Sequence, residues 1–327
     1  MPYIQTVNGP VDPEEMGHIL PHEHIICDAS LSRSYLAKDI PKTQIMFLDD
    51  TDEMIDECRK FKADGGSGIV EVTCHGWGRD PVALAEISRK SGVHIIATTG
   101  FYIEDFMPSW VSDKSIEQLA KWIEREIRNG CNAKLSNNVT NIKAGIIKTA
   151  VSRPHFSHLE LKGLLAVAKS HLKTGAPITS HNSGSIRFEM EGGNIGTEMI
   201  DILENEGVDP KSVIVGHADE NVDIRHLTKL AKRGAFVQFD TVGKAYILDE
   251  TRADLVIGLK KRGYLDHVLL SHDQNRKPIL RNYGGPGYSD IINRFVPLLR
   301  EKGMNDKDIE KILVNNPAKA LCIREDL

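Results

Sequence analysis

The sequence has few cysteines, no long apolar run and no excess of positive charge. The five cysteines are an odd number without a CxxC pair, so we expect free thiols and no disulfide framework. No apolar run approaches the roughly 18 residues of a membrane span, and the first residues lack the basic and apolar regions of a signal peptide. The net charge of -5 gives no basic footprint for nucleic acid. We therefore expect a cytoplasmic protein with no nucleic acid or membrane partner.

What the sequence does contain is a regular alternation of short β-branched runs and amphipathic stretches. Strands are expected at 18–26, 68–74, 94–99, 144–149, 177–181, 213–217, 236–240 and 268–273. Helices are expected at 52–64, 80–91, 115–129, 157–174, 196–206, 222–233, 250–262 and 288–302, with short closing helices over 303–323. The long segment before the first helix suggests an active-site loop.

This alternation predicts an α/β fold in which eight strand and helix units close into a (β/α)8 TIM barrel. No repeat or linker is visible, so 1–327 is expected to form a single domain. An open doubly wound sheet is the alternative. Against it, no G-x-G-x-x-G motif follows the first strand.

The first strand carries the short motif His22-Glu23-His24. Histidines at spacing i, i+2 in a strand lie on one face, where both imidazoles can bind the same divalent metal. Glu23 would then point to the opposite face and is a poor candidate for a general base. Taken alone, the motif also fits two ordinary strand histidines, so a metal site depends on residues further along the chain.

Polar residues of metal-binding type occur in several later strands, four of them being Lys148, His181, His217 and Asp273. The chemistry of a (β/α)8 barrel takes place at the C-terminal ends of its strands. Taken singly, each residue also has an ordinary structural explanation. The histidines could be hydrogen-bonded barrel residues, Asp273 could cap the following helix, and the Lys148 amine could reach solvent. Jointly, chance is a poor explanation, and burial of an unpaired Lys148 ammonium is costly. A carbamate formed from this amine and carbon dioxide would supply an anionic ligand able to bridge two ions.

Further motifs are spread over nearly the whole chain. They are Gln5-Thr6-Val7-x-Gly9-Pro10, Gly76-x-Gly78-Arg79-Asp80, Thr99-Gly100-Phe101-Tyr102, Ile147-Lys148, Ser180-His181, Gly216-His217-x-Asp219, Leu270-Ser271-His272-Asp273, Tyr283-Gly284-Gly285-x-Gly287-Tyr288 and Asn316-Pro317. With these motifs the sequence resembles the phosphotriesterase family of the amidohydrolase superfamily, in particular its phosphotriesterase-related and phosphotriesterase-like lactonase group.

The resemblance implies a distorted barrel that holds two divalent metal ions, with zinc as the first expectation and manganese, cobalt or iron as alternatives. The implied ligands of the more buried ion are His22, His24 and Asp273, and those of the more exposed ion are His181 and His217. Carboxylated Lys148 and a hydroxide would bridge the ions. Attack by this hydroxide would leave Asp273 as the catalytic proton acceptor. Ser180 and Ser271 would then make strand-end hydrogen bonds rather than act as nucleophiles.

Substrate-binding residues are expected in the loops, which vary most. Tyr102 is similar to a tyrosine that faces the metal site in lactonase-type members, although rim packing is an alternative. Cations near the last two strands suit a carboxylate, sulfonate or phosphate on the substrate, and at least two of them are expected to be solvated. They are Lys244, Arg276, Lys277 and Arg281. Lys244 and Arg276 are the two that we expect to bind substrate.

The predicted function is hydrolysis of a small lactone or carboxylic ester that carries an anionic group. An amidase of N-acyl amino acids or taurine and a phosphotriesterase are the alternative hydrolases. An inactive barrel that serves as a binding protein is an alternative of another class, which metal content would separate from an enzyme. The expected partner is a small-molecule substrate, and a homodimer is left open.

Overall fold

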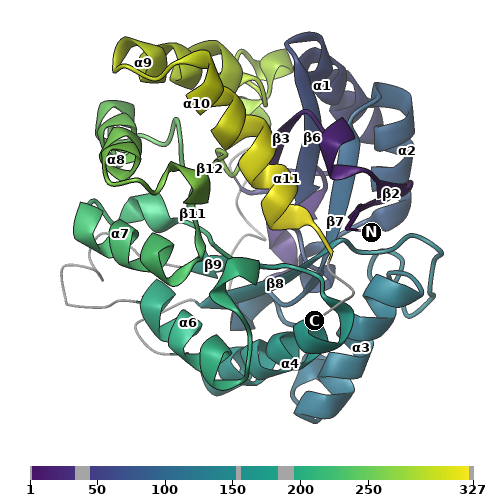
Figure 1. Ribbon diagram of the computed structural model, residues 1–327. Coiled ribbons are helices and arrows are strands. Elements are labelled where there is room, and N and C mark those ends of the chain that lie inside the picture. The colour runs from purple at the N-terminus through teal and green to yellow at the C-terminus, as the bar shows by residue number, and fades with distance from the viewer. Residues whose placement is uncertain (1, 34–44, 152–155, 183–194, 324–327) are drawn as a thin grey trace.

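The protein is described by a computed structural model that covers residues 2–33, 45–151, 156–182 and 195–323. A ring of parallel strands forms its centre, and helices surround the ring (Figure 1). This is a (β/α)8 barrel, so the predicted fold is confirmed and the doubly wound alternative is wrong.

The eight barrel strands follow one another in sequence order around the ring. They are β3 (His18–Glu23), β6 (Gly66–Glu71), β7 (His94–Gly100), β8 (Ile146–Val151), β9 (Ile178–Asn182), β10 (Val213–Val215), β11 (Phe236–Phe239) and β12 (Val268–Leu270). Consecutive strands pair in parallel from β3 to β12. The last strand meets the first through the amides of Asp273 and His24, which donate to the carbonyls of His22 (3.2 Å) and Gln274 (3.1 Å).

The helices on the outside of the barrel connect successive strands. They are α1 (Thr51–Ala63), α2 (Pro81–Ser91), α3 (Ile116–Arg128), α4 (His158–Thr174), α6 (Ile195–Asn205), α7 (Ile224–Arg233) and α8 (Asp249–Lys261). Local signals define their ends: Ser115 and Ser157 begin α3 and α4 with capping boxes, and α4 stops at Gly175, whose φ of 67° favours glycine.

Two large apolar clusters make up most of the core of the described residues. Ile19, Val70, Ile96 and Ile146 belong to a cluster drawn from the strands and closed by Leu321. A larger cluster packs the opposite faces of the strands against the helices. Lys148, His22 and the other polar groups at the C-terminal ends of the strands therefore stand above an apolar plug.

The C-terminal part differs from the predicted helix 288–302. A π-helical segment, Ile291–Phe295, precedes α9 (Val296–Glu301), and a second one, Lys311–Asn315, lies between α10 (Asp306–Glu310) and α11 (Asn316–Leu321). In both cases a proline, Pro297 or Pro317, is the second residue of the following helix. Proline has no N–H to donate four residues back, so the wider turn occurs where that bond is missing.

Three strands are also shorter at their C-terminal ends than the predicted strands 18–26, 213–217 and 268–273. They are β3, β10 and β12, which end at Glu23, Val215 and Leu270. Two short antiparallel strand pairs were not predicted, β1 (Ile4–Thr6) with β2 (Gly9–Val11) and β4 (Cys27–Asp28) with β5 (Phe47–Leu48). Part of the expected active-site loop, residues 34–44, lies outside the described residues.

All five cysteines are free, as predicted. None of the described helices has the length and apolar character needed to span a bilayer.

Candidate metal centre and substrate pocket

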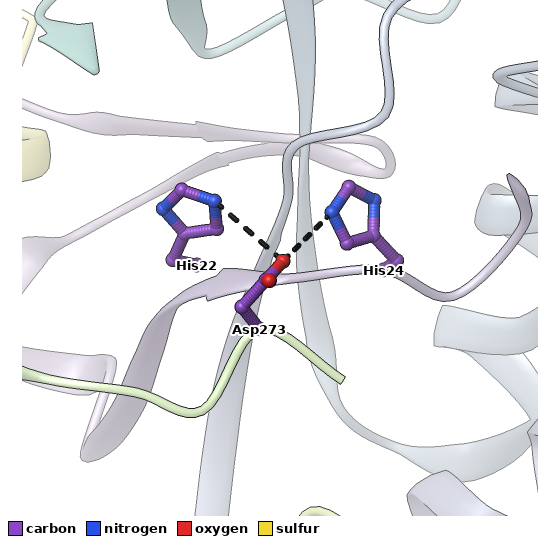
Figure 2. A group of neighbouring side chains, drawn as sticks. All are labelled: His22, His24 and Asp273. Carbon is purple, nitrogen blue, oxygen red and sulfur yellow. Dashed lines mark ion pairs between the residues drawn. The ribbon is translucent and has the colours of Figure 1, made fainter. Parts of the chain in front are cut away.

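His22, His24 and Asp273 meet at the C-terminal mouth of the barrel. Figure 2 shows both imidazoles directed toward the Asp273 carboxylate, whose Oδ1 lies 3.1 Å from Nε2 of His24 and 3.9 Å from Nε2 of His22. One ligand atom from each residue lies within 4.8 Å of the other two, and all three residues are buried. The i, i+2 spacing therefore places both histidines on one side of the chain, as the sequence predicts.

His181 and His217 form a second group beside this trio. Nε2 of His217 lies 2.6 Å from Nδ1 of His181, and the rings are perpendicular. Two imidazole nitrogens that face one another need a proton or a cation between them. His217 has a φ of 52° and Asp273 a φ of 50°, in the left-handed region that non-glycine residues rarely adopt. Such strain is typical of residues that the surrounding structure holds for a function.

Lys148, on β8, contacts the first of these groups. Its side chain is buried, and Nζ lies 3.2 Å from Nε2 of His22. Burial lowers the pKa of the Lys148 ammonium to about 8. A neutral amine is the form that adds carbon dioxide, so this environment is suited to the carbamate implied by the sequence.

Asp240 contacts two of the proposed ligands, His22 and His217, and was not predicted from the sequence. Its two carboxylate oxygens lie 2.8 Å from Nδ1 of His22 and 2.7 Å from Nδ1 of His217. Burial alone would raise the pKa of Asp240, but the two histidines lower it. A carboxylate on the far nitrogen of an imidazole fixes the tautomer that leaves Nε2 free for a metal. The signal was present, since Asp240 directly follows the apolar strand that ends at Phe239.

Two further carboxylates support His24 and the mouth of the barrel. Nδ1 of His24 lies 2.7 Å from Oγ1 of Thr73, which itself donates to Glu71. Glu23 points away from the trio, as predicted, and accepts from Ser271 Oγ (2.6 Å) and from the amide of Gln274 (2.7 Å). Glu23 therefore fastens the segment that carries Asp273 to β3.

The ligand groups open into a cavity of about 380 Å³. The other residues that line it are Met46, Trp77, Tyr102, Lys244, Tyr246, Asn275, Arg276 and Ile279. Trp77 and Tyr102 stack with ring centroids 4.6 Å apart, and the Tyr102 ring lies 4.8 Å from that of His181. Lys244, from the loop after β11, contacts the Asp273 carboxylate.

The four loop cations divide into two pairs. Lys244 and Arg276 line the cavity. Lys277 pairs with Asp49 and Glu53 at 3.7 Å, and Arg281 pairs with Asp64, so both have partners elsewhere.

The two strand-end serines make hydrogen bonds within the barrel. Ser180 Oγ donates to the carbonyl of Ile214, and Ser271 Oγ donates to Glu23. Neither serine has a histidine as its base in these contacts.

The donor set fits divalent metal ions of the zinc type. Imidazole and carboxylate are the donors that such ions take, and bonds of about 2.0–2.2 Å need ligand atoms roughly 3–4 Å apart. Oδ1 of Asp273 has this spacing from Nε2 of His24 and from Nε2 of His22, at 3.1 and 3.9 Å. Positions for five nitrogen and oxygen ligands beside one lysine exceed the needs of one tetrahedral ion.

Comparison with known proteins places the chain in a family. The sequence model of the phosphotriesterase family matches residues 2–321. The phosphotriesterase homology protein of Escherichia coli is 32% identical over 93% of this chain and 97% of its own length. The N-acetyltaurine hydrolase of Homo sapiens is 28% identical, over 98% of both chains. The structure of a lactonase from Listeria monocytogenes superimposes with a TM-score of 0.87, at 29% identity, covering 98% of this chain and 99% of that one.

The chain therefore belongs to the phosphotriesterase family, as the motifs predict. It is a hydrolase of that family.

Proposed function

We propose that the protein is a binuclear metal hydrolase that cleaves a carbonyl bond in a small anionic substrate. His22, His24 and Asp273 would hold one divalent ion and His181 and His217 the other, with carboxylated Lys148 shared between them. The ligand cluster and its fit to zinc-type donors support this assignment. Zinc is the first metal to test, followed by manganese, cobalt and iron.

Bound there, two divalent ions would lower the pKa of a coordinated water and polarise the carbonyl oxygen of the substrate. The residues of the chain then have separate tasks. Asp273 would accept a proton, because its carboxylate lies at the meeting point of the ligands. Asp240 keeps His22 and His217 in one tautomer.

The substrate class is inferred from one observation: Lys244 and Arg276 line the same cavity as the stacked rings of Trp77 and Tyr102. Lys244 and Arg276 follow β11 and β12, whereas Trp77 and Tyr102 follow β6 and β7. A small substrate can place its apolar part on the rings and an anionic group on the cations. We therefore propose a lactone or carboxylic ester with a carboxylate, sulfonate or phosphate. A neutral phosphotriester has no use for these cations.

An amide is the second candidate, and the relatives favour it. The human relative is named N-acetyltaurine hydrolase, as is one from Dictyostelium discoideum that is 33% identical over 288 residues. N-acetyltaurine is an amide that carries a sulfonate, so its charge suits the same two cations. The difference between ester and amide lies in the leaving group, which the metal-ligand cluster does not distinguish.

The test is a hydrolase screen of zinc- and manganese-loaded protein, read as kcat/KM. It should contain lactones, phosphorylated lactones, N-acyl amino acids, N-acetyltaurine and aryl phosphotriesters, each anionic compound with a neutral isostere. We expect the best substrate to be anionic, with an advantage over its isostere that Lys277→Ala retains, since Lys277 pairs outside the cavity. A best substrate that is an uncharged phosphotriester would overturn the proposal.

A further inference from the structure

The loop between β11 and α8, residues 241–248, carries two side chains of the pocket. Lys244 contacts Asp273, and Tyr246 lines the cavity while its hydroxyl donates to Glu220 (2.9 Å). This loop contains neither helix nor strand. Tyr246 is 50% and Leu248 67% exposed, whereas Val242 and Ile247 are buried, so apolar burial holds only part of the loop. The positions of Lys244 and Tyr246 depend in addition on polar contacts.

Those contacts converge on Arg252 in the first turn of α8. The Arg252 side chain is fully buried. Its Nη1 donates to the carbonyls of Ile247 (2.6 Å) and Lys244 (3.2 Å) and to Oδ1 of Asp249 (2.7 Å). Asp249 in turn accepts from the amide of Gly243 at 3.1 Å. The guanidinium is therefore hydrogen-bonded to the loop on both sides of Tyr246.

The other edge of the same guanidinium faces the metal ligands. Its Nε donates to Oδ2 of Asp219 (2.8 Å) and its Nη2 to Oγ1 of Thr241 (2.9 Å). Asp219 accepts from the amide of Asp240 (3.3 Å), and Asp240 is the residue that contacts both His22 and His217. One buried side chain thus joins the pocket loop to the segment that orients the ligands.

We infer that Arg252 is a positioning residue for substrate binding, which holds Lys244 and Tyr246 at a fixed place over the metal-ligand cluster. This inference rests on the proposed function. Arg252 is buried behind the loop and does not line the cavity, so it acts through Lys244 and Tyr246 and not on the substrate itself. Arginine suits this role because its planar fork donates in several fixed directions, whereas a lysine ammonium is a point charge.

The test compares Arg252→Lys with Arg79→Lys. Arg79 is an equally buried arginine whose contacts are with Glu126 and the carbonyl of Thr98, and not with the loop 241–248. Arg252→Lys should raise KM for the anionic substrate about tenfold, change KM for its neutral isostere less than about twofold and leave kcat nearly unchanged. Metal content should stay at the wild-type value, because the contacts of Asp240 with the histidines remain. Arg79→Lys should leave the ratio of the two KM values as in wild type.

Hydrogen exchange supplies a readout that does not depend on the substrate. The amides of Gly243 and Lys244 are bonded to Asp249 and Thr241, and they should exchange faster in Arg252→Lys but not in Arg79→Lys. Thr241→Val, which removes one acceptor of Arg252 and keeps the arginine, should give the same change to a smaller extent. If these amides exchange in folded Arg252→Lys at the same rate as in the wild type, the inference is overturned. Faster exchange with no preference of the wild type for anions would overturn the proposed substrate instead.

Discussion

Each side of the barrel mouth contains a buried ion pair between an arginine and a carboxylate, but the two arginines have different further contacts. On the β6 and β7 side, Arg79 binds Glu126 of α3 through two bonds of 2.7 Å. On the β10 and β11 side, Arg252 binds Asp219, and the same guanidinium holds the pocket loop. Both arginines are fully buried. Burial of an arginine with a carboxylate therefore does not by itself indicate a functional role.

The carboxylates show where the difference lies. Burial would raise the pKa of Glu126, but Arg79 outweighs it and lowers that pKa. For Asp219, burial and the neighbouring Asp240 raise the pKa in spite of Arg252. Asp219 lies beside a second carboxylate, Asp240, which contacts His22 and His217. Glu126 instead accepts from Arg79, from Thr99 Oγ1 and from the amide of Asn132. Variants on the two sides, and on β8 between them, can test this contrast.

The largest effect is expected from Lys148→Ala on β8. This change should abolish hydrolysis and remove metal together, because the ligand that we propose to be shared by both ions would be lost. Elemental analysis after zinc loading, beside turnover, checks it. Added short carboxylates should restore part of both. Full activity and two retained ions would make Lys148 an ordinary barrel lysine.

Asp273→Asn should lower kcat by about a hundredfold or more, because a ligand charge and a proton acceptor disappear together. The fold should persist, since the Asp273 side chain lies at the mouth of the barrel and not in its apolar core. Steady-state kinetics with a thermal melt separate the two effects. Near-normal turnover would remove Asp273 from the mechanism.

Lys244→Ala should raise KM for an anionic substrate about tenfold while KM for its neutral isostere hardly changes, since the lost contact is made in ground and transition states alike. Arg276→Ala should act in the same direction. Lys277→Ala is the matched control, because Lys277 pairs with Asp49 and Glu53 outside the cavity. Equal effects on charged and neutral compounds would return Lys244 to a structural role as the partner of Asp273.

Tyr102→Phe on the opposite side should lower kcat/KM by less than about tenfold. The substitution keeps the ring that stacks on Trp77 and touches His181, and it removes only the hydroxyl. Comparison of kcat/KM for Tyr102→Phe and Tyr102→Leu measures the hydroxyl and the ring separately. Wild-type values in both variants would show that Tyr102 is a packing residue.

The smallest effect on hydrolysis is expected for Glu126→Gln, which should instead cost about 3–5 kcal/mol of stability because Arg79 is left buried without its partner charge. The pKa of Glu126 is lowered from its ordinary value of 4.5. Its contribution to stability is therefore present above pH 4.5 and is lost as the pH falls toward the folded value. Denaturant unfolding between neutral and acid pH should show this loss in the wild type and less of it in Glu126→Gln. A loss of turnover at unchanged stability would contradict the contrast between the two sides.

Several features of the site could be predicted from sequence because they depend on short-range periodicity. The spacing of His22 and His24 in a strand fixes their common side, and an apolar strand around Lys148 fixes its burial. The alternation of strands and helices then determines that all strand ends meet at one mouth. Asp240 could have been found by the same reasoning.

The rest depends on contacts between segments far apart in the sequence. Lys244 and Arg276 line the cavity, whereas Lys277 and Arg281 form ion pairs elsewhere. No local sequence pattern distinguishes the two pairs, because all four residues are loop cations near the same strands. The role of Arg252 was likewise invisible, since a single arginine in an amphipathic helix is usually solvated. The sequence determined the barrel and the ligand types through hydrophobic period and residue chemistry. Only the tertiary structure decided which charges face the pocket, because the direction of a loop side chain is set by the partners that the fold brings within hydrogen-bonding distance.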